Sequence, residues 1–234
     1  MTTAGSSQRP MLSVMVPFHA SLDNLEGIRA TVDTARLPTE IIYVVDTALS
    51  GMMPAMREHE TVICIENRGR GYNLREGARR ARGNVIVFLH ADTRLPDGWD
   101  MAIRDALHDD GVAGGAFSLR FDHDSLFLRL VVLASDLLIH LMGRFSGDRA
   151  MFVRAGLMQA HLDVLDVPIM EDTELSIFMQ KHGKTVLLPG EAVTSADAFV
   201  RHGFIRNTVR IILCSLWYAV GVDLQDIFDY YYRR

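Results

Sequence analysis

Four short apolar runs alternate with segments of helical periodicity in the first half of the chain, and this alternation restricts the fold more than any other feature. The runs cover residues 12–18, 40–46, 61–66 and 85–92. The first two are almost continuously apolar, which predicts strands that are buried on both faces. Strands that alternate with helices are typical of parallel β-α-β construction. The sequence therefore predicts an α/β fold with a mostly parallel central sheet flanked by helices.

The chain has 234 residues, of which 49% are hydrophobic, and this is enough to bury one substantial core. No Pro/Ser-rich linker interrupts it, so we expect a single domain over residues 11–234 after a flexible tail, residues 1–10. The tail has no apolar segment of the kind found in signal peptides, which favours a cytoplasmic location. A net charge of -5 offers no general attraction for nucleic acid, and we expect no such partner.

The two cysteines, Cys64 and Cys214, lie far apart, each within an apolar run. Neither belongs to a C-x-x-C pair or stands beside histidines with metal-ligand spacing. This placement predicts two buried free thiols.

Glycines mark the predicted ends of two helices. The helix after the turn NRGRG is expected to end at Gly83, and the helix over 171–182 at Gly183. The other expected elements are a strand over 113–121, a helix from Ser125, a loop over 143–152, two short strands over 185–190 and 193–199, and helices from Phe204 onward.

Two long apolar stretches, residues 126–142 and 205–222, raise the question of a membrane. A spanning helix needs about 20 mostly apolar residues, and Arg129, Asp136 and His140 interrupt the first stretch. We therefore expect neither stretch to span. On a helix these polar residues fall along one line and leave a wide apolar face. The face can pack on the protein's own core, on a second copy in a homodimer, or peripherally on the inner face of a membrane, and the sequence leaves these alternatives open.

Polar residues follow the predicted strands at the edge where open α/β sheets bind their ligands. The second strand ends at Asp46, and the fourth ends at His90, Ala91 and Asp92. An acidic residue directly after an apolar strand is costly unless it caps a turn or binds a ligand. For Asp46 and Asp92, the alternative to ligand binding is therefore a cap on the turn that follows.

Longer runs of sequence resemble a known enzyme family. The run FLHADTRLP follows ARRARGN, and VVD ends a strand two strands earlier. These features resemble family 2 glycosyltransferases of the GT-A fold, from about Met11 to Tyr218. A closer resemblance, to the subgroup of radical-SAM/selenodomain-associated transferases, lies in GRGYNLREGARRARGNVIVFLHADTRLPDGW, GGAFSLRF, GDRAMFVR and RHG. The resemblance implies one Rossmann-like domain with a nucleotide-binding half, about 11–110, and an acceptor half, about 111–234.

The resemblance implies a metal-assisted donor site at the end of the fourth strand. The family carries a D-x-D motif there, whose first residue contacts the donor's ribose and whose last holds a divalent Mn²⁺ or Mg²⁺ between the phosphates. Here the motif reads H-A-D, which places His90 at the ribose, Ala91 beside it and Asp92 on the metal. One carboxylate plus the diphosphate can suffice for such a cation. His202 is a candidate second ligand, with an ordinary surface histidine as the alternative.

Further positions are implied to contact the nucleotide of the donor. Asp46 matches the family's acid at the base, and Pro17 with Phe18 matches the loop under the base. Of the family's usual acid-acid-glycine-serine run, VVDTALSG keeps only the first acid. Arg70 matches a basic residue near the nucleotide, and its alternative is a solvated turn arginine.

The resemblance also implies a catalytic base. The segment PIMEDTEL places Glu171 and Asp172 at the start of a predicted helix, where the helix dipole alone favours acids by about 0.3 to 1 kcal/mol. They match the family's E-D motif, whose aspartate is the usual base in inverting members. Asp172 is therefore the expected base, with Glu171 as its support or as an acceptor contact. Less specific assignments place Gly114 and Gly115 near the donor sugar and the loop over 146–148 in the acceptor pocket.

The implied function is transfer of a sugar from a nucleotide-diphosphate sugar, by default a UDP-sugar, to a hydroxyl acceptor with inversion. Two other classes of protein are alternatives to a glycosyltransferase. A nucleotidyltransferase would need a glycine- and basic-rich loop directly after the first strand, and VPFHASLDN has none. The other class is a non-catalytic nucleotide-binding or scaffold protein on a degenerate GT-A fold. Loss of the metal site in such a protein would explain why the motif reads H-A-D. Donor turnover distinguishes this alternative from an enzyme.

Overall fold

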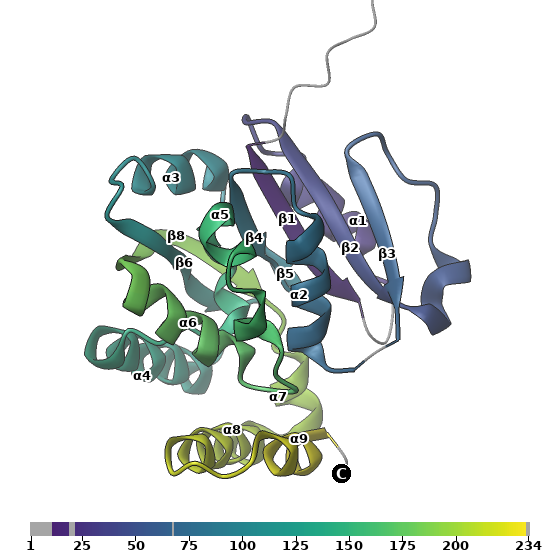
Figure 1. Ribbon diagram of the computed structural model, residues 1–234. Coiled ribbons are helices and arrows are strands. Elements are labelled where there is room, and N and C mark those ends of the chain that lie inside the picture. Colours follow the sequence, from purple (N-terminus) through teal and green to yellow (C-terminus); the bar gives the residue numbers. More distant parts are fainter. Residues whose placement is uncertain (1–10, 19–21, 67, 233–234) are drawn as a thin grey trace, which may run out of the picture.

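The computed structural model describes residues 11–18, 22–66 and 68–232, which form one mixed β-sheet with helices against both faces (Figure 1). The tail expected over residues 1–10 lies outside this part of the chain. The strands are β1 (Leu12–Phe18), β2 (Thr39–Asp46), β3 (Glu60–Ile65), β4 (Val85–Phe88), β5 (Thr93–Arg94), β6 (Val112–Phe121), β7 (Met151–Arg154) and β8 (Lys184–Thr194). Their order across the sheet is β3-β2-β1-β4-β7-β6-β8-β5.

The first half of the sheet is parallel, as predicted. β1 lies between β2 and β4 and pairs in parallel with both, and β2 pairs in parallel with β3. Every residue of β1 is buried, and so are residues 40–45 of β2, which confirms the prediction of strands covered on both faces. The crossover helices are α1 (Leu25–Val32) between β1 and β2, and α2 (Arg70–Arg80) between β3 and β4.

The second half of the sheet introduces antiparallel pairs and differs from the sequence expectations at two places. β7 pairs antiparallel with β4 and with β6, whereas residues 143–152 were expected to be a loop. The expected strands 185–190 and 193–199 are confirmed as strand up to Thr194, but they form one strand, because β8 runs unbroken from Lys184 to Thr194. The assignment beyond Thr194 is wrong, since residues 197–199 are helical. The interruption that Pro189 and Gly190 suggested is a shift of register against β6, not the end of a strand.

Two predicted element ends also require correction. β4 ends at Phe88 and not at Asp92, and the chain turns directly afterwards, where the Thr93 N–H donates to the His90 carbonyl at 3.1 Å. α2 ends at Arg80, so Gly83 is not its cap. Gly83 is needed for close packing instead, because a Cβ there would lie 2.8 Å from the backbone of Leu12.

The helices divide between the two faces of the sheet. One apolar cluster joins α1 and α3 (Trp99–Ala106) to one face, and a second cluster joins α2, α5 (Ala155–Gln159) and α6 (Glu171–His182) to the other. The remaining elements are α4 (Leu126–Met142), α7 (Asp197–His202), α8 (Phe204–Ala219), α9 (Leu224–Tyr232) and the 3-10 turns η1 (Thr47–Met52), η2 (Gly147–Arg149) and η3 (Leu162–Leu165).

A buried ion pair ties α1 to the edge of the sheet. The Arg29 guanidinium donates two hydrogen bonds to Glu60 of β3, at 2.8 and 2.6 Å, and the Tyr43 hydroxyl donates a third at 3.1 Å. Burial disfavours the charged carboxylate, but these bonds and one from the Arg57 backbone N–H outweigh it and lower the pKa of Glu60. Glu60 is therefore ionised and saturated with donors.

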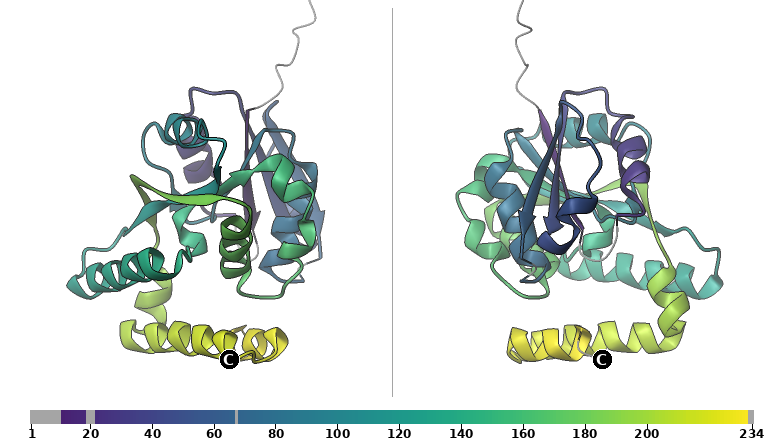
Figure 2. Two further views of the ribbon diagram at one scale, coloured as in Figure 1. Left: turned by 60° about the vertical axis from the view of Figure 1, so that its left-hand side comes forward. Right: turned by 90° about the vertical axis from the view of Figure 1, so that its right-hand side faces the viewer.

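Helices α4, α8 and α9 lie on one side of the molecule, below the sheet in Figures 1 and 2, with α8 and α9 farthest from it. The apolar face of α4 is not buried in the protein's own core, since Leu126 and Leu141 are 74% and 72% exposed. Within the described residues, no helix combines the length and apolarity needed to cross a bilayer.

The prediction of two buried thiols holds for Cys214 but is wrong for Cys64, which is exposed because β3 is the edge strand.

Candidate active site

Four segments that are distant in sequence meet beside the carboxyl end of β4. They are the start of α2 at Arg70, the turn over 90–92, η2, and the start of α6 at Glu171. Three contacts join them: Arg70 Nε to Glu171 Oε1 at 3.0 Å, His90 Nδ1 to Asp148 Oδ1 at 2.8 Å, and the Gly147 N–H to Asp172 Oδ2 at 2.9 Å. The sheet thus brings together candidates from both the expected donor half and the expected acceptor half.

Arg70 is not a solvated turn arginine, the alternative that the sequence left open. Its side chain is 22% exposed and pairs with Glu171. Burial disfavours the charged guanidinium, yet the negative charges of Glu171, Asp172 and Asp148 more than compensate and raise the pKa of Arg70. Arg70 is thus a fixed positive charge surrounded by carboxylates.

The two acids that begin α6 have different environments. Glu171 is buried, and burial together with the nearby charge of Asp172 raises its pKa, although Arg70 opposes the shift. Asp172 is half-buried, and its carboxylate accepts from the backbone N–H groups of Gly147 and Thr173, at 2.9 and 2.7 Å. Asp172 is therefore held in one orientation by main-chain donors.

Backbone strain is concentrated around these acids. Among the described residues, only Ala150 and Met170 have positive φ without being glycine, with φ of 49° and 64°. Ala150 directly follows η2, and Met170 directly precedes Glu171. Such conformations cost of order 1–3 kcal/mol and are characteristic of functional sites.

Asp148 is a site residue that the sequence indicates only as the last member of the loop over 146–148. It faces His90, and although burial opposes ionisation, the positive charges of His90, Arg70 and Arg149 lower the pKa of Asp148 to about 2. The loop over 146–148 had been assigned to the acceptor pocket, whereas its aspartate contacts the histidine of the H-A-D motif. No spacing in the sequence indicates this contact, because the two residues are 58 positions apart.

Asp92 is exposed at the rim of the cluster. Its pKa is raised, because protein groups displace part of the carboxylate's hydration and because Asp148 is negative, while His90 and Arg70 oppose the shift. A carboxylate whose pKa is raised by partial loss of hydration and by a neighbouring carboxylate suits a hard divalent cation. In the described part of the chain, no three His, Cys, Asp or Glu side chains are grouped to hold an ion. A cation at Asp92 would therefore need further ligands, such as the diphosphate oxygens of a nucleotide sugar.

The expected nucleotide contacts lie at the ends of β1 and β2. Asp46 is half-buried, and its Oδ1 caps η1 by accepting from the Ala48 N–H at 2.8 Å, so the capping interpretation is realised and one carboxylate oxygen remains. Pro17 and Phe18 are buried, and the Phe18 ring packs against Tyr43 at 5.9 Å. Any ligand at this strand end would therefore meet the backbone rather than the Phe18 ring. Ala91 offers a carbonyl that already accepts from the Asn24 side chain.

The C-terminal helix also reaches the cluster. Tyr232, at the end of α9, is 53% exposed, yet neighbouring protein groups displace part of its hydration and, with the charge of Glu171, raise its pKa to about 12. The family resemblance extends only to about Tyr218, so the sequence gives no signal for a site residue on α9. His202, the candidate second metal ligand, is exposed and lines a separate pocket with residues of α8 and α9.

Solved structures share the fold of this chain. A mannosyltransferase from Pyrobaculum calidifontis, in complex with GDP-Man and Mn²⁺, superposes with a TM-score of 0.61 and 17% identity over 88% of this chain and 61% of its own. S. aureus TarS 1–349 superposes with a TM-score of 0.55 and 13% identity, over 79% of this chain and 60% of its own. Its complex with UDP-GlcNAc superposes with a TM-score of 0.57 and 13% identity, over 79% of this chain and 58% of its own. The chain thus spans about three fifths of each of these structures. This likeness confirms the predicted fold, the mixed α/β architecture of the GT-A type.

The family follows from the sequence itself. The profile of glycosyl transferase family 2 matches residues 13–152, more than half of the chain. The chain belongs to this family, as the resemblance implied. No curated protein matches the sequence.

Proposed function

We propose that this enzyme transfers a sugar from a nucleotide-diphosphate sugar to a hydroxyl acceptor with inversion at the anomeric carbon. The observation that carries the proposal is the Gly147–Asp172 hydrogen bond beside the Arg70–Glu171 ion pair. Together they support a positioned base and a fixed cation at the end of the strand that leads into the H-A-D motif.

The donor is proposed to lie across the ends of β1, β2 and β4. Asp46 would contact the nucleotide base and His90 the ribose, and Arg70 would neutralise part of the diphosphate. Asp92 would hold a Mn²⁺ or Mg²⁺ shared with the phosphates, and the ion would supply positive charge to the leaving group. UDP is the default nucleotide, and the sugar is not specified by any of these contacts.

Transfer requires one displacement and one proton transfer. The acceptor oxygen forms a bond to the anomeric carbon while the bond from that carbon to the diphosphate breaks, and the hydroxyl proton passes to Asp172. The electron pair of the broken bond leaves with the diphosphate, whose negative charge Arg70 would partly neutralise. Attack from the face opposite the leaving group gives inversion without a covalent enzyme intermediate.

Calorimetric titration of UDP, GDP and dTDP, with and without Mn²⁺, tests the donor site. We expect metal-dependent binding of one nucleotide to the wild type and its loss in Asp92→Ala. Asp163→Ala, an exposed-loop control on η3, should bind as the wild type does. If no nucleotide binds to the folded protein, the donor-site assignment is wrong and a non-catalytic role on this fold becomes the better interpretation.

Three finer assignments stay predictions. The division into a nucleotide half, about 11–110, and an acceptor half, about 111–234, is one. The second is membership of the radical-SAM/selenodomain-associated subgroup, and the third is the cytoplasmic location. Both rest on the sequence features given above.

A further inference from the structure

Exposed apolar side chains are concentrated on two helices. Of the seventeen large apolar residues that are exposed in the described chain, seven lie on α4 and five on α8. Single exposed apolar residues are ordinary, but a concentration of this kind marks an interaction surface. All three views place both helices on the same side of the molecule (Figures 1 and 2).

The exposed residues form one stripe on each helix, with the same spacing. On both helices they recur at i, i+4, i+7, i+11 and i+15, which is one face of an α-helix. The α4 stripe consists of Leu126, Leu130, Leu133, Leu137 and Leu141, and the α8 stripe consists of Ile205, Val209, Ile212, Leu216 and the following Val220. Exposed fractions range from 48% to 76%, so none of these side chains is covered by the rest of the described chain.

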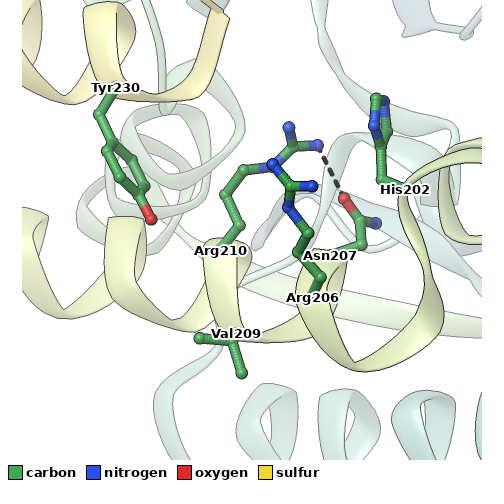
Figure 3. Close-up of a pocket in the computed structure, with 6 residues that line it drawn as sticks. All are labelled: His202, Arg206, Asn207, Val209, Arg210 and Tyr230. Atoms are coloured by element: carbon green, nitrogen blue, oxygen red, sulfur yellow. Dashed lines mark hydrogen bonds between the residues drawn. The ribbon is translucent and has the colours of Figure 1, made fainter. Parts of the chain in front are cut away.

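A basic pocket adjoins the α8 stripe. Its volume is about 280 Å³, and its lining residues are His202, Arg206, Asn207, Val209, Arg210 and Tyr230 (Figure 3). Val209 belongs to both the pocket and the stripe. Arg206 and His202 have no hydrogen-bond or ion-pair partner within the described part of the chain, and Nε of Arg210 is buried and unpaired there. Such a pocket is complementary to an anion.

The character of the stripes favours lipid over a second protein chain. They are entirely aliphatic, whereas protein interfaces are enriched in aromatic residues and arginine. α8 contains Arg206 and Arg210 but no acidic residue, in a chain of net charge -5. A symmetric dimer on this face would bring two such basic groups together, whereas an anionic bilayer would neutralise them.

We propose that α4 and α8 dock the enzyme on an anionic lipid bilayer, with the two stripes at the acyl boundary and a headgroup phosphate in the pocket. Amphipathic helices of this length bind membranes by this combination of apolar burial and basic charge.

Both docking helices are connected to the candidate active site. On α4, Asp136 Oδ1 lies 2.6 Å from Nη2 of the fully buried Arg149 in η2. On α8, the Tyr218 hydroxyl donates to Glu174 of α6 at 2.5 Å. The bilayer would thus lie next to the elements that carry Asp148 and Asp172. The docking inference itself does not depend on the proposed reaction.

Vesicle flotation with the full chain tests the inference. We expect binding to vesicles of phosphatidylcholine mixed with phosphatidylglycerol, weaker binding to phosphatidylcholine alone, and loss of binding as salt is raised. Leu133→Glu and Ile212→Glu should each lower the partition coefficient at least about tenfold. Met52→Glu is the matched control, because Met52 is 68% exposed on η1, away from both stripes.

A second pair of variants tests the basic pocket. Arg206→Gln should lower binding to the anionic vesicles about fivefold, and Arg104→Gln on α3 should not change it. Unfolding midpoints of all variants establish that they are folded. The proposal is overturned if the wild-type protein does not bind to the vesicles. A wild-type dimer that becomes monomeric in both Leu133→Glu and Ile212→Glu would then identify the stripes as a protein interface. Equal binding to both lipid compositions, unaffected by Arg206→Gln, overturns the role of the pocket.

Discussion

The backbone N–H of Gly147 donates a 2.9 Å hydrogen bond to Oδ2 of Asp172, the candidate base. The next residue, Asp148, contacts His90 of the H-A-D motif at 2.8 Å. One short turn therefore holds the expected acceptor side and the expected donor side of the site at once. The orientation of Asp172 depends on this turn and not on α6 alone.

Gly147→Ala should reduce activity without unfolding the protein. A Cβ at this position would collide with the Arg70 guanidinium and lie 2.7 Å from Nε2 of His90. Displacement of catalytic groups by about 1 Å can cost about a hundredfold in rate, so kcat should fall by this order. The control is Gly156→Ala on α5, where a Cβ meets nothing within 4 Å. Wild-type turnover in Gly147→Ala would mean that the turn tolerates the shift.

Asp172→Asn should separate binding from transfer. An amide oxygen can still accept from the Gly147 N–H, so the turn and the donor site should remain intact. The variant lacks a base, and kcat should fall by about 10²- to 10⁴-fold. Calorimetry of the nucleotide and steady-state transfer measured on the same preparation give the comparison. A variant with full transfer activity would remove Asp172 from the role of base.

The Arg29–Glu60 pair should govern acid stability. Because the folded-state pKa of Glu60 is lowered, its stabilising contribution is fully present above the ordinary glutamate pKa of about 4.3. It is lost as the pH falls from there through the lower folded-state value.

Glu60→Gln should therefore destabilise the protein at neutral pH by about 3 kcal/mol, because it leaves the buried Arg29 charge with only an exposed partner, Glu26. The variant should also show a flatter loss of stability toward acid in urea unfolding. Glu26→Gln removes the other, 75% exposed partner of Arg29 and should cost less than about 1 kcal/mol. Equal effects of the two substitutions would contradict the burial argument.

Trp217 should report docking on lipid. The chain has two tryptophans, and Trp99 is fully buried in the core of the sheet. Trp217 lies half-buried on α8 and packs against Tyr230 at 4.9 Å. Anionic vesicles with brominated acyl chains should quench the Trp217 emission, and Trp217→Phe should abolish the quenching. Quenching that persists in this variant would place the lipid nearer to Trp99 than the structure allows.

The parallel half of the sheet was predictable because each of its strands carries its own signal. β1 and β2 are buried on both faces, so almost every residue in them is apolar and the runs stand out in the sequence. β7 has only four residues and no such pattern, and its pairing with β4 and β6 depends on segments far away in the chain. The helical period of α4 was equally visible, but exposure of its apolar face depends on which neighbours the fold supplies.

The candidate site was predictable only as a set of separate residues. The resemblance indicated Arg70, Asp92 and Asp172 one by one, and the structure brings their segments together. The contact between His90 and Asp148 could not be predicted, because it depends on the tertiary position of η2. Tyr232 was missed for the same reason, since α9 carries no motif of its own.

The adjacency of Gly147 and Asp148 has a kinetic consequence. A nucleotide sugar that draws His90 away from Asp148 would shift the turn that orients Asp172, so the base would reach its working position only after the donor is seated. Acceptor binding would then follow donor binding in a compulsory order, with the nucleoside diphosphate as the last product to leave. The nucleoside diphosphate would accordingly inhibit competitively against the donor and noncompetitively against the acceptor.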